Sequence, residues 1–357
     1  MDLLQELILV SEKAANVARI CRQDHHLFQL LVQKKKTDES NPRFVEDFKT
    51  LADVLIQEMV KHDIGNKFPG LANDIRGEEN NTFCNKLQES ITVQVMDTVS
   101  DTSNLLQQVL NGDEHAAELL AKEVHAEIKM DDVNTEKDFK PFEVDIDNVG
   151  IWIDPIDCTG EYINGVDVEF ENNIYLSGLR CVTVLIGVYD KTTELPIIGI
   201  INQPFLEKNG LKWRGQCVWG VSTDSCRKSS IQLSSPRNRI ISMSSSESVE
   251  VKNKLLEKGF KLAEASGAGY KILTVILGHA DVYLLSKDTT FKWDTCAPHA
   301  ILKSLGGNLL IYEDALRNTQ SSIKYPTETA DCNHSNRGGL IAYKDVDVLN
   351  EVLSHLT

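Results

Sequence analysis

Apolar residues recur at helical spacing in the first part of the chain. Residues 2–32 place them every three or four positions, which predicts an amphipathic helix packed against a core. A second helix is predicted over about 44–61. Between the two, residues 34–42 are polar and basic and end at Pro42, so we expect a loop there.

Continuous apolar runs in the middle of the chain predict buried strands. These runs cover residues 149–153, 181–189, 195–202 and 217–221. The second and third runs are separated by a short polar segment, as in a β-hairpin. This part of the chain is therefore expected to form a largely antiparallel sheet.

After a polar stretch at 227–239, predicted strands and helices alternate. Strands are expected at 240–243, 261–265, 281–285, 308–312 and 339–343, and helices at 249–258, 266–278, 295–305 and 346–356. The predicted fold class is α/β, with an α+β domain over residues 1–235 and a smaller α/β domain over 236–357.

An acidic segment at about 80–140 interrupts the first domain. It has helical patterns at 102–110 and 114–126 and contains no motif typical of an active site. We interpret it as an elaboration made mainly of solvated helices.

The charge balance limits the possible partners. The chain has 37 Lys and Arg against 53 Asp and Glu, a formal charge of −16, which disfavours nucleic-acid and anionic-membrane surfaces. An anionic small-molecule substrate remains possible. The eight cysteines form no C-x-x-C pair, the N-terminus lacks a basic leader, and no long apolar run is present. We therefore expect a cytoplasmic monomer with reduced thiols.

Two carboxylates follow the strand predicted at 149–153. Asp154 and Asp157 flank Pro155 and precede a short helical pattern that includes Glu161. Clustered acids suit Mg²⁺, and the free N–H groups of a helix start favour an anion, so phosphate chemistry is indicated. The alternative is structural: Asp154 ends a strand and Asp157 caps a helix.

Further acids occur in a recurring order. Asp53 is followed by Glu78-Glu79, then by D-P-I-D-C-T, then by Asp294, with eleven residues between Asp294 and Gly306. This order resembles the lithium-sensitive, magnesium-dependent phosphatase superfamily of inositol monophosphatase-like enzymes. The resemblance implies a layered αβαβα sandwich and covers essentially the whole chain.

The resemblance also implies roles for individual residues. Two or three Mg²⁺ ions would be held by Glu78, Glu79, Asp154, the Ile156 carbonyl, Asp157 and Asp294. Asp53 and Thr159 would form a hydrogen-bonded pair that activates water, and the N–H groups of Cys158 and Thr159 would receive the phosphate. His279 and His299 are expected to be core or surface residues, because magnesium sites favour oxygen ligands.

By the same resemblance, the substrate would contact Asp157, Ser244, Ser246, Gly267, Ala268, Lys271 and Asp288. Ordinary packing for the glycine and a surface position for Lys271 are the alternatives. Two positions depart from the family: Ser246 stands in place of a Lys, and Cys158 in place of Ser or Gly. The pKa of the Cys158 thiol is expected to fall beside a metal and a helix start.

Within the superfamily, the segments G-I-W-I-D-P-I-D and D-T-T-F-K-W-D are most similar to enzymes acting on inositol polyphosphates. This similarity implies hydrolysis of the 1-phosphate of inositol 1,4-bisphosphate and inositol 1,3,4-trisphosphate, with inhibition by Li⁺. A 3′(2′),5′-bisphosphate nucleotidase is the alternative enzyme. A non-catalytic inositol-phosphate-binding regulator is the alternative outside enzymes, although every acid of the motif is present.

Overall fold

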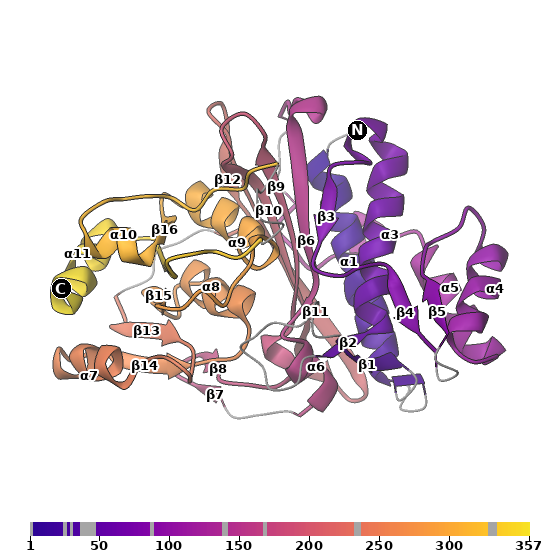
Figure 1. Ribbon diagram of the computed structural model, residues 1–357, viewed down its shortest axis with the longest axis horizontal. Helices are drawn as coiled ribbons and strands as arrows, with labels where there is room; N and C mark the ends of the chain where they lie inside the picture. The colour runs from indigo at the N-terminus through magenta and orange to yellow at the C-terminus, as the bar shows by residue number, and fades with distance from the viewer. Residues whose placement is uncertain are drawn as a thin grey trace.

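The computed structural model describes most of the chain, and two sheets dominate it (Figure 1). The described residues are 3–23, 27–28, 31–35, 48–85, 89–137, 142–166, 170–231, 237–327 and 334–357. Much of the loop predicted at 34–42 and the first residues of the helix predicted at 44–61 lie outside these ranges. The same is true of parts of the segments predicted at 2–32 and 227–239.

Within the described ranges, the first sheet has six strands, and it confirms the apolar runs as strands. Its spatial order is β12 (Arg227–Ser229), β11 (Lys212–Ser222), β10 (Pro196–Asn209), β9 (Thr183–Asp190), β6 (Val149–Asp157) and β3 (Ile75–Gly77). Neighbouring strands are antiparallel except β3 and β6, which run parallel. β6 is buried along its whole length, as its apolar sequence requires.

The second sheet has five strands, all close to their predicted positions. Its order is β14 (Lys261–Glu264), β13 (Ile240–Met243), β15 (Val282–Leu285), β17 (Leu340–Tyr343) and β16 (Asn308–Ile311). The first three strands are parallel, and β17 is antiparallel to both of its neighbours. The proposed division into domains 1–235 and 236–357 stays a prediction.

Helices separate and cover the two sheets, which gives the expected αβαβα layers (Figure 1). The helices of these layers include α1 (Leu3–Gln23), α3 (Leu51–Lys67), α7 (Val249–Glu257), α8 (Ala268–Ile276), α9 (Lys292–Ser304) and α11 (Val346–Leu356). α1 and α3 cover one face of the first sheet, α8 and α9 lie between the sheets, and α7 and α11 pack outside the second sheet with the short α10 (Tyr312–Leu316).

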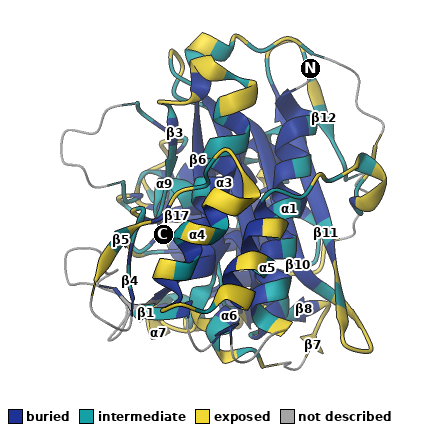
Figure 2. Cartoon of the chain, turned by 90° about the vertical axis from the view of Figure 1, so that its right-hand side faces the viewer, coloured by how far each residue is buried: buried dark blue, intermediate teal, exposed yellow. Residues whose placement is uncertain are grey.

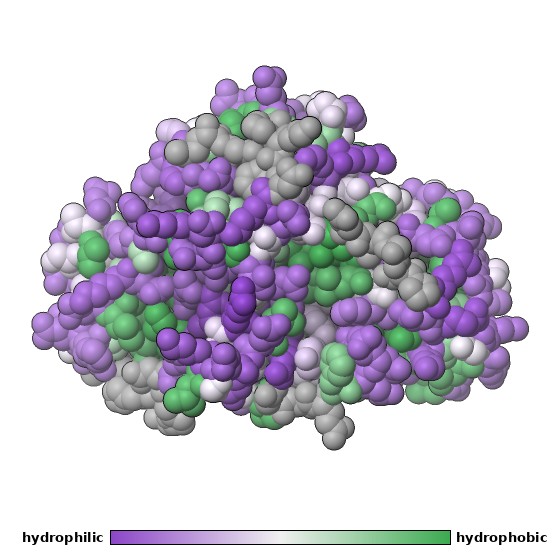
Figure 3. All heavy atoms as spheres, turned by 180° about the vertical axis from the view of Figure 1, so that it is seen from behind, coloured by the Kyte–Doolittle hydropathy of each residue, from purple (hydrophilic) through white to green (hydrophobic). Residues whose placement is uncertain are grey.

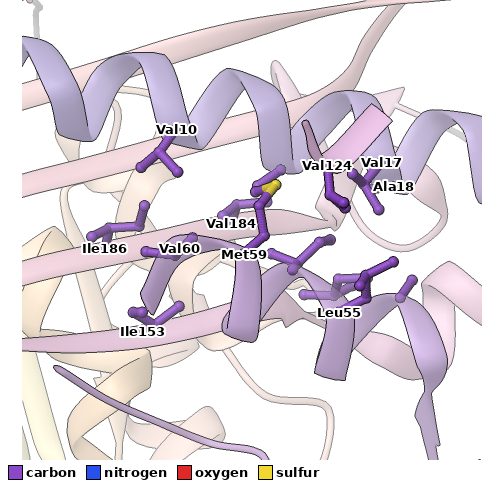
Figure 4. Packing of buried hydrophobic residues seen from close by; sticks show 14 of the residues in the cluster. Val10, Val17, Ala18, Leu55, Met59, Val60, Val124, Ile153, Val184 and Ile186 are labelled. Atoms are coloured by element: carbon purple, nitrogen blue, oxygen red, sulfur yellow. The ribbon is translucent and has the colours of Figure 1, made fainter. Parts of the chain in front are cut away.

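The core under α1 and α3 is aliphatic. In Figure 4, Val10 of α1 lies above Val60 of α3 and Ile186 of β9, and Met59 of α3 lies beside Val184 of β9. All five side chains are buried. This packing fixes α3 against the sheet that carries Asp154. Asp53, in the first turn of α3, is therefore held against the same sheet.

The acidic elaboration forms two helices as predicted, α4 (Val99–Val109) and α5 (Glu114–Val124). Their description as mainly solvated is only half correct. Leu106, Leu120 and Val124 belong to the core cluster of α1 and α3, whereas the outward faces are exposed (Figure 2).

A space-filling view from behind shows mostly hydrophilic residues with small, separate hydrophobic patches (Figure 3). No helix among the described residues has both the length and the apolar character to cross a bilayer.

A row of glycines brings α9 close to the first sheet. Gly187, Gly199 and Gly220 lie on adjacent strands and pair in register. A Cβ at Gly199 would lie 2.0 Å from the Ala297 carbonyl oxygen, and one at Gly187 would lie 2.4 Å from the Ala297 nitrogen. Only glycine permits this approach, and the approach carries the N-terminal turn of α9 to β6.

The predicted second helix begins later than expected. Its pattern suggested a start near residue 44, but residues Phe48–Thr50 form strand β2, paired with β1 (Val32–Lys34). α3 begins at Leu51 because Thr50 and Asp53 form a capping box. Two further hairpins are β4 (Thr82–Cys84) with β5 (Ser90–Thr92), and β7 (Phe170–Glu171) with β8 (Ile174–Tyr175).

Candidate active site

Three carboxylates converge where β6 ends against the first turn of α9. Asp154 and Asp157 come from β6, and Asp294 is the third residue of α9. One oxygen from each lies within 4.8 Å of the others. These are the acids that the sequence predicted, brought together from positions more than a hundred residues apart.

The start of α9 is held by its cap and by aromatic packing. The main-chain N–H of Phe291 donates to the Asp294 carboxylate at 2.6 Å. The rings of Phe291 and Trp293 stack with centroids 4.7 Å apart, and Trp293 lies 6.0 Å from the buried Trp152 of β6. Trp293 therefore packs the start of α9 against β6, and Asp294 is fixed relative to that strand.

Asp154 lies at the centre of this cluster and lacks a full set of donors. Its Oδ1 is buried and has no hydrogen-bond partner among the described residues. Burial, followed by the charges of Glu78, Asp157 and Asp294, raises the pKa of Asp154 well above its ordinary value. An unpaired buried carboxylate oxygen among further acids fits a divalent cation with oxygen ligands.

A second set of acids comes from α3 and the end of β3. The Asp53 carboxylate accepts hydrogen bonds from the Thr50 main-chain N–H at 2.6 Å and from the Thr50 hydroxyl at 2.7 Å. The Gln57 side chain donates to the Glu79 carbonyl and accepts from the Glu79 N–H at 2.9 Å, so α3 also fixes this turn. The charge of Glu78 raises the pKa of Asp53, and the charge of Asp53 raises the pKa of Glu79, so the three carboxyl groups lie near one another.

Burial sets the protonation of these groups. It raises the pKa of Asp53 to about 7, with hydrogen bonds from Thr50 acting in the opposite direction. It raises the pKa of Glu79 to about 8 against the attraction of Lys35. Asp53, which the sequence could place only as a helix acid, is thus a buried carboxylate that titrates near neutrality.

Lys35 is a member of the site that the sequence analysis missed. Its ammonium lies 2.6 Å from Glu78 Oε1 and 2.7 Å from Glu79 Oε1. The residue stands in a run of three lysines, which is typical of a solvated loop. Only its position just after the short strand β1 turns it inward, and no local pattern signals that.

Asp157 has a different structural role from the one predicted. It was expected to cap the helix that follows it, but α6 (Thr159–Asn164) is preceded by Cys158, whose side chain makes no capping bond. The Asp157 carboxylate instead accepts from the Gly269 N–H at 2.8 Å, the Ala268 N–H at 3.3 Å and the Thr183 hydroxyl at 3.2 Å. It caps α8, since a carboxylate at a helix start satisfies free N–H groups.

The hydrogen bond expected for Thr159 is not the one that forms. The Thr159 hydroxyl donates to the Ile156 carbonyl at 3.1 Å, and not to Asp53. Burial and the neighbouring Asp157 carboxylate raise the pKa of the Cys158 thiol, and the fall expected beside a bound metal stays a prediction. Cys158 has a φ of 75°, a left-handed conformation that glycine adopts more easily.

The predicted substrate residues lie around these acids to different degrees. Gly267 is in contact distance of Asp157, since a Cβ there would lie 3.0 Å from Asp157 Oδ2. Lys271 is buried, not on the surface, and donates to the Ala265 carbonyl at 3.1 Å. Its charge lowers the pKa of Asp157 against the larger effect of burial.

Three more residues predicted to contact the substrate, Ser244, Ser246 and Asp288, form hydrogen bonds with protein groups near the second sheet. The hydroxyls of Ser244 and Ser246 lie 3.0 Å apart. The exposed Asp288 accepts from the Gly338 N–H at 2.7 Å and the Gly339 N–H at 3.1 Å. Their contact with substrate stays a prediction.

His279 and His299 are not part of the carboxylate cluster, as expected for core or surface histidines. His299 is fully buried, and its ring nitrogens lie 3.1 Å from the Tyr325 hydroxyl and 2.8 Å from the Asn308 amide oxygen. Burial lowers the pKa of His299 to about 3. His279 is partly buried, and burial lowers its pKa as well.

Comparisons with known proteins agree with this geometry. A profile described as the inositol monophosphatase family matches residues 56–341. The chain is 43% identical to a mouse inositol polyphosphate 1-phosphatase over 99% of this chain and 97% of that protein. A 3′(2′),5′-bisphosphate nucleotidase 1 from Dictyostelium discoideum is 34% identical, over 47% of this chain and 53% of that protein.

A comparison with solved structures finds the same fold in related proteins. The crystal structure of the extragenic suppressor protein suhB from Bartonella henselae superposes with a TM-score of 0.56 at 10% identity, covering 99% of this chain and 98% of that one. At this identity the likeness concerns the fold alone. Together with the family match, these findings show that the chain is a phosphatase and belongs to the inositol monophosphatase family.

Proposed function

We propose that this phosphatase is Mg²⁺-dependent and hydrolyses the 1-phosphate of inositol 1,4-bisphosphate and inositol 1,3,4-trisphosphate. The observation that carries the metal dependence is the convergence of Asp154, Asp157 and Asp294 around a buried, unpaired oxygen. The substrate assignment is supported by 43% identity over nearly the full length of the mouse inositol polyphosphate 1-phosphatase.

The residues that would hold the metal are those of the two acid sets. Asp154, Asp157 and Asp294 supply one cluster. Glu78 lies near it, because its charge raises the pKa of both Asp154 and Asp53. Glu79 lies near Asp53, whose charge raises the pKa of Glu79. When bound, divalent cations supply polarisation of the phosphate and a lowered pKa for a coordinated water. We propose inhibition by Li⁺ at one of these positions.

Asp53 is the proposed proton acceptor for the attacking water. A general base works best with a pKa near the operating pH, and burial brings the pKa of Asp53 to about 7. Thr159 would relay the proton after its hydroxyl leaves the Ile156 carbonyl. The same movement would free that carbonyl to act as a ligand.

We assign the phosphate and the inositol ring to residues around Asp157. The main-chain N–H groups of Cys158 and Thr159 would receive the scissile phosphate. A main-chain role there tolerates the thiol of Cys158. The buried ammonium of Lys271, close enough to lower the pKa of Asp157, would attract further anionic groups. Seven cysteines among the described residues are free thiols, which supports our proposal that the protein is cytoplasmic. A monomer is the oligomeric state that we propose.

The test is phosphate release from inositol 1,4-bisphosphate with Mg²⁺, measured for the parent protein and for Asp53→Ala. We expect turnover by the parent and a loss of at least ~100-fold in kcat for the variant, as for removal of a general base. Isothermal titration with Mg²⁺ should show that the variant still binds metal.

The nucleotidase is the second candidate, because one such enzyme shares 34% identity with about half of the chain. Adenosine 3′,5′-bisphosphate is therefore assayed in parallel. A kcat/KM that favours the nucleotide would reject the inositol assignment. Hydrolysis of neither compound by a protein that binds Mg²⁺ would favour the binding regulator.

A further inference from the structure

A buried lysine bridges two of the acids assigned to metal. Lys35 Nζ lies 2.6 Å from Glu78 Oε1 and 2.7 Å from Glu79 Oε1, and the side chains of Lys35 and Glu79 are each only 4% exposed. Removing an ammonium from water is costly unless oppositely charged partners surround it. Here two carboxyl groups do so, and the ammonium of Lys35 balances part of their charge.

The backbone holds Lys35 at this position. It directly follows β1, whose Val32 pairs with Thr50, the residue that caps α3 in front of Asp53. The Gln33 side chain of β1 also accepts a hydrogen bond from the Cys84 N–H at 3.0 Å, which ties the strand to the segment after Glu79. The ammonium is therefore part of the built site, not a surface side chain that folds over it.

A divalent cation and this ammonium would compete for the same oxygens. Mg²⁺ binds carboxylate oxygens at about 2.1 Å, inside the distance at which Lys35 now contacts them. Two like charges this close would repel strongly in a buried site. Occupation of Glu78 and Glu79 by metal consequently requires the ammonium to move away.

We propose that Lys35 is an internal counter-cation that holds Glu78 and Glu79 until a divalent metal replaces it, a regulation of the metal site that rests on the proposed function. The exchange stabilises the fold when metal is scarce. It also lowers the apparent metal affinity, which is the intrinsic affinity multiplied by the fraction of molecules in which the ammonium has left the acids. The enzyme thereby becomes sensitive to the metal concentration.

The test compares Lys35→Met with the parent protein by calorimetric titration with Mn²⁺ alone and by thermal unfolding in EDTA or excess Mg²⁺. We expect the Kd for Mn²⁺ to fall about ten-fold, the change produced if one parent molecule in ten is free to bind. In EDTA the variant should melt below the parent, and Mg²⁺ should raise its Tm by more than it raises the Tm of the parent.

Lys13→Met is the matched control. Lys13 forms an ion pair with Asp63 at 2.5 Å, ten residues and therefore about 15 Å along α3 from Asp53. Its loss should lower the Tm equally with and without Mg²⁺ and leave the Kd for Mn²⁺ unchanged. An equal fall in Kd for both variants would overturn the assignment to Lys35.

A measurement on the parent protein covers the case in which Lys35→Met does not fold. Reductive methylation followed by peptide mass spectrometry should find Lys35 protected in EDTA and several-fold more reactive with Mn²⁺. Unchanged or lower reactivity, or an equal Kd in the parent and Lys35→Met, would overturn the counter-cation while leaving the phosphatase proposal standing. A parent that binds no Mn²⁺ would overturn both.

Discussion

Asp53→Asn should abolish activity and yet stabilise the protein in EDTA. The carboxylate is buried, and its pKa rises from an ordinary value of 3.8 to about 7. A rise of about three pH units corresponds to at most about 4 kcal/mol of destabilisation in the ionised form. Asparagine has nearly the same shape but carries no charge, so this penalty disappears.

The hydrogen bonds from Thr50 are already contained in this value. Both donors reach the same oxygen, Oδ2, and an asparagine carbonyl can accept both. Their preference for the charged carboxylate opposes burial in setting the pKa of about 7, so it is not subtracted a second time. The stabilisation is then at most about 4 kcal/mol, or about 8 °C in Tm at the low end of the range for large domains.

The pH dependence identifies the cause. A carboxyl whose folded pKa is raised destabilises the fold progressively as the pH rises from its unfolded to its folded pKa. The difference in unfolding free energy between Asp53→Asn and the parent should be near zero at pH 4, grow with pH, and level off above about pH 7. Urea unfolding in EDTA at several pH values measures it.

The control is Asp113→Asn, which alters the capping residue of α5, where the Ala116 N–H donates to Asp113 at 3.0 Å. That exchange should change stability by no more than about 0.5 kcal/mol, since asparagine caps as well as aspartate. If Asp53→Asn is equally neutral, or destabilises at pH 7, then burial and neighbouring charge do not raise the pKa of the Asp53 carboxyl group.

Three further changes test the rest of the site. Asp294→Asn should reduce the rise in Tm on adding Mg²⁺ to less than half that of the parent, because one acid of the central cluster is lost; an unchanged rise would remove Asp294 from the metal ligands. Gly199→Ala should destabilise by about 3 kcal/mol in urea, since its Cβ meets the Ala297 carbonyl, whereas Gly160→Ala, with open space around it, should be neutral or slightly stabilising. Cys158→Gly should keep kcat/KM within about three-fold if only its N–H is used, because glycine accepts the left-handed conformation; a larger loss would assign a role to the thiol.

Local sequence patterns predicted most helices and strands well, because the burial and periodicity of nearby residues largely decide where these elements form. Strand β13 coincides with its apolar run, and the runs of β6 and β9 need only burial on both faces. The start of α3 was misplaced because β2 takes its first residues, and β2 exists only through pairing with β1. That pairing is a contact between segments more than ten residues apart, which periodicity does not encode.

The site shows the same division. The acids of β6 could be found as carboxylates after a buried strand, but their meeting with Asp294 depends on the close approach of α9 to the glycine row. The role of Asp157 as a cap for α8, and the burial of Lys35, likewise arise from contacts across the fold. Resemblance to a known family located the acids; only the structure shows what holds each of them.

The hydrogen-bond donors around the acids indicate which carboxylate depends most on a cation. Each of the others has a donor: Thr50 for Asp53, Lys35 for Glu78 and Glu79, Gly269 for Asp157, and the Phe291 N–H for Asp294. Asp154 keeps an unpaired oxygen among them. Because a buried unpaired oxygen gains most from a ligand, Asp154→Asn should weaken Mn²⁺ binding more than Asp157→Asn, whose carboxylate is already shared with α8. Equal losses in calorimetric titration would show that the metal does not distinguish the two.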